Sequence, residues 1–149
     1  MKADQIMTPQ PVVCVPTTSL REVAELMVEY DCGEIPVVSS IRTMEPIGVV
    51  TDRDITCRAV AQGRNPLELT AEDCMSSPCV TVDRDESVEL CCQVLEDNQV
   101  RRVLVVDHSG RLCGILSQAD IAEFARPAQT AEIVKAISQP GGAPSNGRG

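Results

Sequence analysis

Apolar and polar positions along the chain follow two different periods. Between Leu20 and Met27, apolar residues recur at intervals of three and four, which is the spacing of an amphipathic helix with one buried face. Ser19 stands before this run and Glu22 follows three positions later, so a capping box is predicted at the helix start. Short apolar runs of strand length, bounded by Pro, Gly and polar turn residues, separate the helical stretches. The pattern predicts small sheets with flanking helices.

The predicted elements occur in the order strand, helix, strand, strand, helix, and this order occurs twice. In the first half they are residues 12–15, 20–30, 35–38, 47–50 and 52–62. In the second half they are residues 79–82, 87–98, 102–106, 112–116 and 118–124. A connector with a short helical turn from Thr70 to Met75 joins the halves, because Thr70 and Asp73 form a second capping-box pattern.

The two halves are copies of one another. A shift of 68 positions aligns Met7 with Met75 and Val37 with Val105. After two additional residues in the first copy the shift becomes 66, and it then aligns three further pairs: Gly48 with Gly114, Thr51 with Ser117, and Asp54 with Asp120. Such self-similarity over most of a chain indicates a tandem repeat.

Each copy places a Ser/Thr-x-x-Asp pattern where a strand passes into a helix. The first turn of a helix offers unpaired N–H groups to an anion, and a carboxylate can accept two hydrogen bonds from a diol. Thr51 with Asp54, and Ser117 with Asp120, could therefore hold a ribose phosphate. The same spacing is also an ordinary helix cap that needs no ligand. One copy alone would favour the cap.

Residues 33–38 and 47–54, with their counterparts 101–107 and 113–120, resemble the CBS domain, present here as a tandem pair. Leu104 departs from the pattern, because the first copy has Pro36 at this position. The resemblance implies an α+β fold in which two βαββα CBS repeats pack as a pseudo-twofold pair around small sheets with flanking helices. Residues 1–64 would form repeat 1 and residues 65–126 the connector and repeat 2. Residues 127–139 could form a C-terminal helix, and residues 140–149 have the composition of a disordered tail.

The resemblance also implies a ligand, namely an adenine nucleotide (AMP, ADP or ATP) or a related adenosyl compound, bound in clefts between the repeats. It assigns Asp54 and Asp120 to ribose hydroxyls, and Thr51 and Ser117 to the phosphate or adjacent oxygens. The base of each ligand would lie against the other repeat. The residues implied are Met7, Val12 and Cys32 for the site of Ser117 and Asp120, and Met75, Val80 and Val100 for the site of Thr51 and Asp54.

The charges beside the two predicted sites differ. Arg101 and Arg102 open the strand beside Ser117, and the resemblance points them at the ligand phosphate, whereas the matching residues beside Thr51 are Gly33 and Glu34. Arg53 could partly compensate there. We therefore expect AMP or ADP to prefer the cleft of Ser117, Asp120 and Arg102. Alternatively, both arginines are solvated charges of an edge strand.

The composition argues against several classes of protein. A net charge of −9 and a pI near 4.5 disfavour binding to nucleic acid or to an anionic membrane, because phosphates must be met by clustered Lys and Arg. With one Tyr, one Phe and no Trp, an aromatic platform for base stacking is nearly excluded. No apolar run reaches the length of a membrane span, and no secretion signal opens the chain, so a cytoplasmic location is predicted.

The reactive residue types suggest neither catalysis nor a metal site. The eight cysteines contain no Cys-x-x-Cys pair, and the one histidine, His108, lies in a turn beside Ser109 and Gly110. The cysteines, including the pair Cys91 and Cys92, are interpreted as small buried apolar residues. No nucleophile with an adjacent base is visible, so a binding protein is favoured over an enzyme.

Three functions remain open. The favoured one is a regulator that needs no cofactor, senses the adenosyl ligand and passes a change of shape to an unknown protein target. The alternatives are a structural or partner-interaction module with empty clefts and, less favoured, a cysteine-based redox sensor or a metal sensor. A homodimer is also predicted, because the helices that follow the two Ser/Thr-x-x-Asp patterns have apolar faces and tandem CBS modules commonly pair through them. These faces consist of Ile55, Ala59, Val60, Ile121, Phe124 and Ala125.

Overall fold

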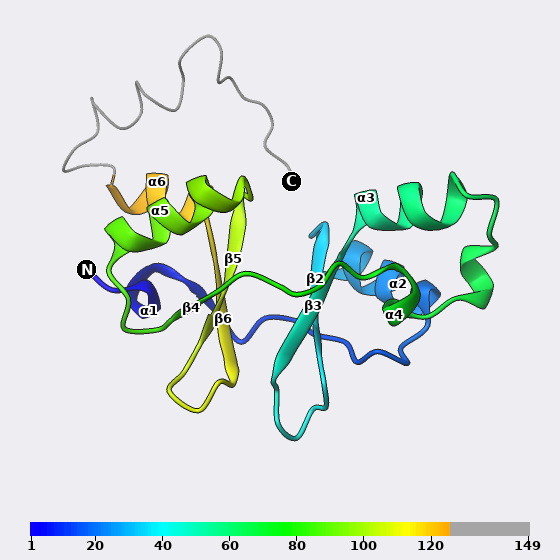
Figure 1. Cartoon of the computed structure of the whole chain (residues 1–149), viewed down its shortest axis with the longest axis horizontal. Coiled ribbons are helices and arrows are strands. Elements are labelled where there is room, and N and C mark those ends of the chain that lie inside the picture. Colours follow the sequence, from blue (N-terminus) through cyan, green and yellow to red (C-terminus); the bar gives the residue numbers. More distant parts are fainter. Residues whose placement is uncertain (126–149) are drawn as a thin grey trace, which may run out of the picture.

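Two antiparallel hairpins form the centres of the two halves of the molecule (Figure 1). The computed structural model describes residues 1–125. In the first hairpin β2 (Glu34–Val38) pairs with β3 (Pro46–Thr51), and in the second β5 (Arg102–Val106) pairs with β6 (Leu112–Ser117). The register shifts by one bulge in each hairpin, between Val37 and Val38 and between Val105 and Val106. The same irregularity at equivalent positions shows that the repeat in sequence is a repeat in structure.

Helices follow the capping signals of the sequence. α2 (Leu20–Glu29) begins after Ser19, whose hydroxyl accepts a hydrogen bond from the N–H of Glu22 at 3.1 Å. α5 (Val88–Asn98) begins after Ser87 in the same way. α6 (Gln118–Ala125) follows β6. These helices and the central strands confirm the predicted order, and each boundary lies within one residue of the predicted one.

The helix predicted at residues 52–62 is wrong in its second half. α3 (Asp52–Ile55) passes directly into the π-helix η1 (Thr56–Val60). The N–H of Ala61 donates to the carbonyl of Thr56, five residues earlier, at 2.8 Å, so the α-helical pattern is not continued.

The strand predicted at residues 12–15 is reduced to a single bridge. Only Cys14 lies parallel to β2, with its N–H donating to Pro36 and its carbonyl accepting from Val38. The equivalent strand of the second half, predicted at 79–82, is β4 (Thr81–Asp83), which pairs parallel with β5.

The halves exchange the segments that precede them. α1 (Ala3–Ile6) and β1 (Thr8–Pro9) come before the first half in sequence, yet β1 pairs with β6 and gives a sheet of order β1-β6-β5-β4. The short 3₁₀-helix η2 (Pro66–Glu68) and α4 (Ala71–Cys74) come before the second half, and Ser76 then bridges to Val49 on β3. Figure 1 shows α1 in the same half as α5 and α6, and α4 in the same half as α2. The units in space therefore differ from the sequence repeats at their leading ends.

Three apolar clusters form the interior. The first contains buried residues of α2, β2 and β3 together with Ala71 and Cys74 of α4. The second contains those of α5, β5 and β6 together with Ala3 of α1. The third lies between the two hairpins and includes Val38, Leu104 and Leu112. The halves are consequently joined by a shared core, as expected for repeats too small to bury enough surface alone.

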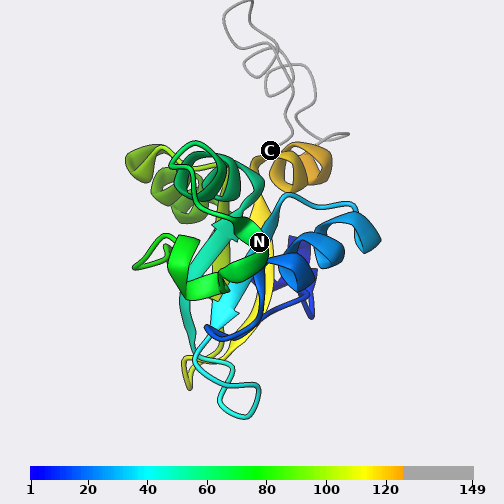
Figure 2. The same cartoon turned by 90° about the vertical axis from the view of Figure 1, so that its right-hand side faces the viewer.

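The two hairpin loops lie at the same end of the molecule (Figure 2). The guanidinium of Arg111 donates to the carbonyl of Arg42 at 2.8 Å, and the N–H of Leu112 donates to the carbonyl of Met44 at 2.8 Å. These bonds hold the loops together, so the first residues of β2 and β5 come to lie at the opposite end.

The α+β architecture of two repeats is thus the one that the sequence predicted. Within residues 1–125, no helix is both long and apolar enough to span a bilayer. The predictions of a helix at 127–139 and a disordered tail at 140–149 lie outside the described residues.

Candidate functional site

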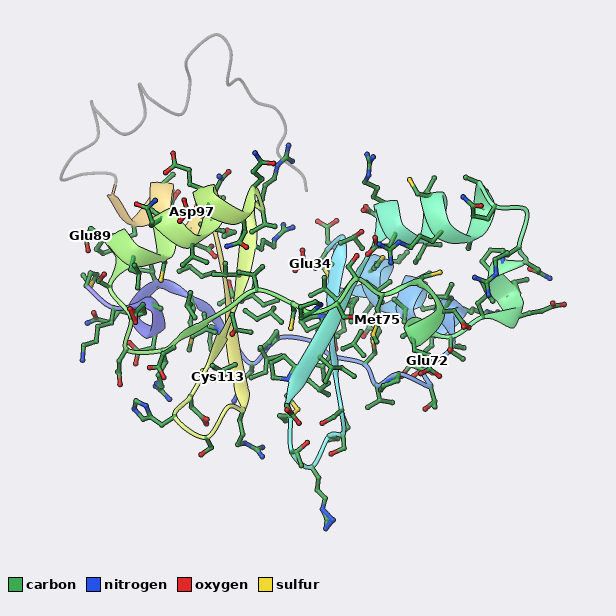
Figure 3. All side chains as sticks on the ribbon, viewed as in Figure 1. Glu34, Glu72, Met75, Glu89, Asp97 and Cys113 are labelled. Atoms are coloured by element: carbon green, nitrogen blue, oxygen red, sulfur yellow. The ribbon has the colours of Figure 1, made fainter. Side chains whose placement is uncertain are left out.

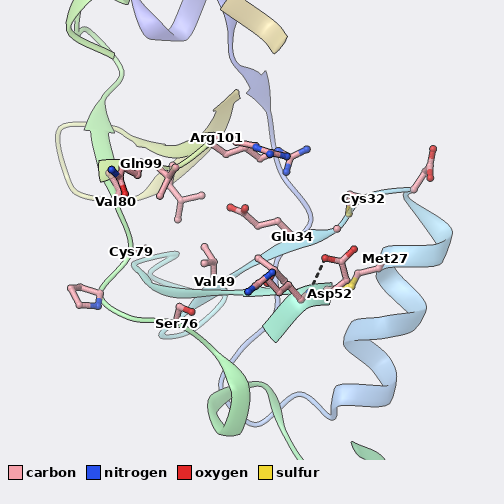
Figure 4. A pocket seen from close by; sticks show the side chains of 18 residues that line it. Met27, Cys32, Glu34, Val49, Asp52, Ser76, Cys79, Val80, Gln99 and Arg101 are labelled. Carbon is pink, nitrogen blue, oxygen red and sulfur yellow. Dashed lines mark hydrogen bonds between the residues drawn. The ribbon is translucent and has the colours of Figure 1, made fainter. Parts of the chain in front are cut away.

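A cleft of about 1040 Å³ lies between the two halves, where β2 and β5 begin (Figure 4). Two equivalent segments, residues 31–34 and 99–102, form opposite parts of its wall. Residues 51–53 at the start of α3 add a third part, and Ser76 with residues 78–80 of the connector adds a fourth. Both repeats and the connector between them therefore contribute to one site.

The two equivalent segments meet because the chain turns sharply after each long helix. Asp31 and Gln99 have φ angles of 52° and 54°, in the left-handed region, and each redirects the chain from a helix into a strand. A shift of 68 positions relates the two segments, so Glu34 and Arg102 occupy equivalent places at the first residues of β2 and β5. The cleft lies across the pseudo-twofold axis.

Both Ser/Thr-x-x-Asp patterns are closed helix caps. The hydroxyl of Thr51 accepts from the N–H of Asp54 at 2.9 Å, and the carboxylate of Asp54 accepts from the N–H of Thr51 at 3.0 Å. Ser117 and Asp120 form the same two bonds, each at 3.0 Å. Each aspartate thus uses one carboxylate oxygen for its cap, and its second oxygen stays available for other partners.

Asp54 also joins the helix start to the connector. Its Oδ1 lies 3.3 Å from the hydroxyl of Ser76, which donates to it, and 3.9 Å from Nε of Arg58. The guanidinium of Arg58 in turn donates to the carbonyl of Met75 at 2.8 Å. The side chain of Asp54 is 14% exposed. A ligand that engaged this carboxylate would therefore act on the connector through Ser76.

The structure brings about half of the predicted site residues together. Thr51, Arg53, Cys32, Val80, Val100, Arg101 and Arg102 all line the cleft. Asp54 lies directly behind Thr51, joined to it by the cap. The association of Val80 and Val100 with the site of Thr51 is the arrangement expected for a base held against the other repeat.

The other predicted residues lie outside this cleft, and most of them were predicted for the second site, that of Ser117 and Asp120. Met7 and Met75 do not line the cleft: each covers a glycine of the central strands, Gly114 and Gly48, and packs against a core. Val12 packs against the first core. Ser117 and Asp120 are not among the lining residues of this cleft, and Cys32 lies with Thr51 rather than beside them. Cys32, which was predicted for the site of Ser117 and Asp120, thus lines the cleft of Thr51 instead.

Sequence reasoning missed several lining residues. Gly33 and Glu34 had been named beside Thr51, and those not anticipated are Met27, Asp31, Val49, Asp52, Ser76, Pro78, Cys79, Gln99 and Leu104. The repeat carried part of the missing signal, because the pairing of Cys32 with Val100 also pairs Asp31 with Gln99. Ser76 had no such signal, since its place depends on the bridge to Val49.

Opposite charges share the cleft. The sequence argument assigned Glu34 and Arg102 to separate clefts, whereas both side chains line this one, because the beginnings of β2 and β5 meet at the pseudo-twofold axis. Burial raises the pKa of Glu34 above its usual value; the charge of Arg102 acts in the lowering direction and that of Asp54 in the raising direction. Figure 3 places Glu34 between the halves, while Glu72, Glu89 and Asp97 lie on the outside.

The thiols are unpaired with one another, and the histidine lies beside two carboxylates. All eight cysteines are free, and burial raises the pKa of Cys14 to about 12 and that of Cys91 to about 11, which disfavours their thiolates. Cys57 on η1 and Cys92 on α5 are exposed, so their interpretation as buried residues is wrong. Cys92 follows the buried Cys91 and lies on the other side of the helix. His108 contacts the exposed carboxylates of Asp85 and Asp83, at 2.9 and 3.5 Å.

Comparison with known proteins identifies the family. The model of the CBS domain matches residues 3–59 and again residues 71–126. The chain therefore belongs to the CBS domain family, with two copies in tandem, as the sequence indicated.

Relatives include proteins of archaea and bacteria. Uncharacterized protein MK0525 of Methanopyrus kandleri is 38% identical over 108 residues, which cover 72% of this chain but only 54% of that protein. Hypoxic response protein 1 of Mycobacterium tuberculosis is 35% identical over 122 residues, covering 82% of this chain and 83% of that protein.

Solved structures share the fold over most of the chain. The crystal structure of Hypoxic Response Protein I with two coordinated zinc ions has a TM-score of 0.74 at 32% identity, and the match covers 83% of this chain and 98% of that one. The crystal structure of CBSX2 in complex with AMP has a TM-score of 0.72 at 26% identity, covering 83% and 95%.

Proposed function

We propose that this protein is a regulatory module that binds an adenine nucleotide (AMP, ADP or ATP) or a related adenosyl compound and transmits the resulting change of shape to a protein partner. The observation that carries the proposal is the cleft between the repeats, which combines aliphatic walls with three arginines. Its volume is at the upper end of the roughly 300–1,000 Å³ typical of small-molecule sites. The similarity to CBSX2, which was solved with AMP, supports the same class of ligand.

The chemistry of the wall suggests how such a ligand would lie. The lining residues include no aromatic side chain, so the base would pack between aliphatic groups such as Val80 and Val100. Arg53, Arg101 and Arg102 offer guanidinium groups, which bind phosphate through charge-assisted hydrogen bonds. Thr51 and the carboxylate of Asp54 behind it would then bind the ribose side of the ligand.

The proposed response follows from the contacts of Asp54. A ribose hydroxyl that donates to Oδ1 would compete with the hydroxyl of Ser76 for the same acceptor. Ser76 belongs to the connector, and its backbone stays bonded to Val49 on β3, so loss of its hydroxyl bond to Asp54 would act at the point where the connector meets the first repeat. This gives ligand binding a direct path to a change of shape.

A screen of melting temperature with adenosine, AMP, ADP, ATP, S-adenosylmethionine, NAD and zinc tests the proposal. A ligand that binds only the folded state stabilises it by about 2.7 kcal/mol at a hundred times its dissociation constant. Stabilisation by one or more adenosyl compounds supports the proposal. No shift with any of them would favour the structural module with empty clefts, and a shift with zinc alone would favour a metal sensor.

The first prediction concerns the ribose carboxylates. Asp54→Ala and Asp120→Ala are each expected to weaken binding at one cleft by on the order of 2–3 kcal/mol, because each removes an acceptor of two hydroxyl donors. Loss of the helix cap alone should cost about 1 kcal/mol of stability. Isothermal calorimetry with the best ligand of the screen measures the first quantity, and urea unfolding the second.

Asp73→Ala is the matched control. Asp73 closes the cap of α4 by accepting from the N–H of Thr70 at 2.9 Å, but it is exposed and does not line the cleft. It should lower stability as the other two substitutions do and leave affinity unchanged. If all three variants bind as tightly as the parent, the aspartates serve only as caps.

The second prediction is a homodimer. Ala59 is buried in the first core, and Ile55 and Ile121 pack against the cores, so these residues close the monomer. Val60 and Phe124 remain 58% and 39% exposed on the helices that follow the two motifs. We expect sedimentation at tens of micromolar to give twice the chain mass of 16.0 kDa.

A double variant tests which surface forms the dimer interface. Val60→Glu combined with Phe124→Glu should give the monomer mass, because it places charge on both apolar patches. Leu67→Glu is the control, since Leu67 is 69% exposed on η2 and outside the proposed interface. A parent protein with the monomer mass, or a control variant that dissociates as well, would contradict the proposed interface.

A further inference from the structure

One acidic side chain lies within the wall of the cleft where a phosphate would bind. Glu34 is the first residue of β2 and extends into the space between the repeats (Figure 4). Its equivalent on the other repeat is Arg102, and both residues line the cleft. At the first residues of the two equivalent strands, the repeats therefore carry opposite charges.

Glu34 is half-buried in the wall of the cleft, where charges interact more strongly than they do in open solvent. Burial is the largest influence on its pKa and raises it, and the positive charge of Arg102 acts on it in the opposite direction. A phosphate that reached Arg102 would lie in the same cleft as this carboxylate. Two negative groups at short range repel, and the repulsion is larger where water is partly excluded.

The other charges of the cleft do not remove this repulsion. Asp31 and Asp52 also line it, against Arg53, Arg101 and Arg102, so its wall carries three acidic and three basic side chains. Each further phosphate on a ligand therefore adds negative charge to a site that is already balanced. A nucleoside or a monophosphate avoids most of this cost.

We propose that Glu34 selects the ligand of this cleft by charge, favouring adenosyl compounds with one phosphate or none over nucleoside triphosphates. The inference rests on the proposed function, because it names the class of ligand within it. Glu34 acts as a specificity-determining residue: it competes with the phosphate for Arg102 and repels each additional phosphate.

Calorimetry with adenosine, AMP and ATP, on the parent and on Glu34→Gln, tests the proposal. Glutamine keeps the length of the side chain and removes its charge. The affinity for ATP is expected to rise about tenfold or more, that for AMP by a smaller factor, and that for adenosine by less than about twofold. Glu89→Gln, which removes an exposed charge of α5 outside the cleft, is the control for net charge and should change none of the three.

A second variant tests the partner of Glu34. Arg102→Ala should lower the affinity for AMP more than that for adenosine, because only AMP has a phosphate that the guanidinium can bind. Its melting temperature, like that of Glu34→Gln, shows whether the fold is retained. Equal losses for AMP and adenosine would mean that Arg102 does not bind the phosphate.

The outcomes separate this inference from the proposed function. If adenosine or AMP binds the parent and Glu34→Gln binds ATP no better than the parent does, charge selection by Glu34 is overturned while the proposed function stands. The same conclusion follows if Glu34→Gln raises the affinity for all three ligands by the same factor. If none of the three binds either protein while another adenosyl compound of the screen does, this inference fails and the proposed function stands. If no adenosyl compound binds, both fail.

Discussion

Gly48→Ala is expected to lower the free energy of unfolding by about 2–3 kcal/mol, the upper range for overpacking a core. Gly48 lies on β3, and a Cβ atom there would lie 2.7 Å from the carbonyl oxygen of Ser76 and 3.1 Å from the sulfur of Met75. The carbonyl cannot withdraw easily, because Ser76 is held on both sides by hydrogen bonds with Val49, at 2.8 and 3.0 Å. Urea unfolding measures the loss.

Gly114→Ala provides the matched comparison. Its Cβ would meet the side chain of Met7 first, and the carbonyl of Thr8 lies 3.0 Å away. Removing the Met7 side chain should relieve that clash. In the Met7→Ala background, Gly114→Ala is expected to cost about 1 kcal/mol less than in the parent.

The equivalent double variant should behave differently. Met75→Ala leaves the carbonyl of Ser76 in place, so the cost of Gly48→Ala should be nearly the same in both backgrounds. If Met75→Ala rescued Gly48→Ala as well as Met7→Ala rescues Gly114→Ala, the backbone contact would not be the source of the destabilisation.

The elements that are determined by residues close to them in the sequence could be predicted from the sequence alone. β5 begins and ends at the predicted residues, Thr70 forms the predicted capping box with Asp73, and Ser19 caps α2 through its hydroxyl. These features follow from apolar periodicity and from side chains that bond to the backbone three residues away. The π-helix η1 has no comparable local pattern, and the sequence therefore predicted an uninterrupted helix there.

The composition of the cleft could be predicted only in part. Thr51, Val80 and Val100 were placed together because the repeat and the family resemblance relate them. The meeting of Glu34 with Arg102 was missed, since it depends on how two strands 68 residues apart approach across the pseudo-twofold axis. Met7 and Met75 lie over strand glycines, Gly114 and Gly48, a position that the sequence argument did not anticipate because a long apolar side chain suits the space above a glycine as well as it suits a ligand.

Because each leading segment packs against the other half, a substitution in one sequence repeat should destabilise the half formed by the other. Ala3 and Ala71 are equivalent, each is 0% exposed, and Ala3 belongs to the core of the second half while Ala71 belongs to that of the first. Their backbone contacts match as well. The N–H of Ala3 donates to the carbonyl of Glu86 and the N–H of Ala71 to that of Thr18, both at 2.8 Å.

An aspartate at either position would be buried without a partner, which costs about 3–5 kcal/mol when the charge is not compensated. Ala3→Asp should therefore detach α1 and β1 and raise amide hydrogen exchange in β6 and α5, far from it in sequence. Ala71→Asp should raise exchange in β3 and α2 instead.

Ala24→Asp, at an exposed position of α2, is the control and should cost less than about 1 kcal/mol through helix propensity alone. Exchange measured by mass spectrometry on peptides from each half decides between the two patterns. If Ala3→Asp loosened the first half and Ala71→Asp the second, each leading segment would belong to its own sequence repeat and the exchange between the halves would be wrong.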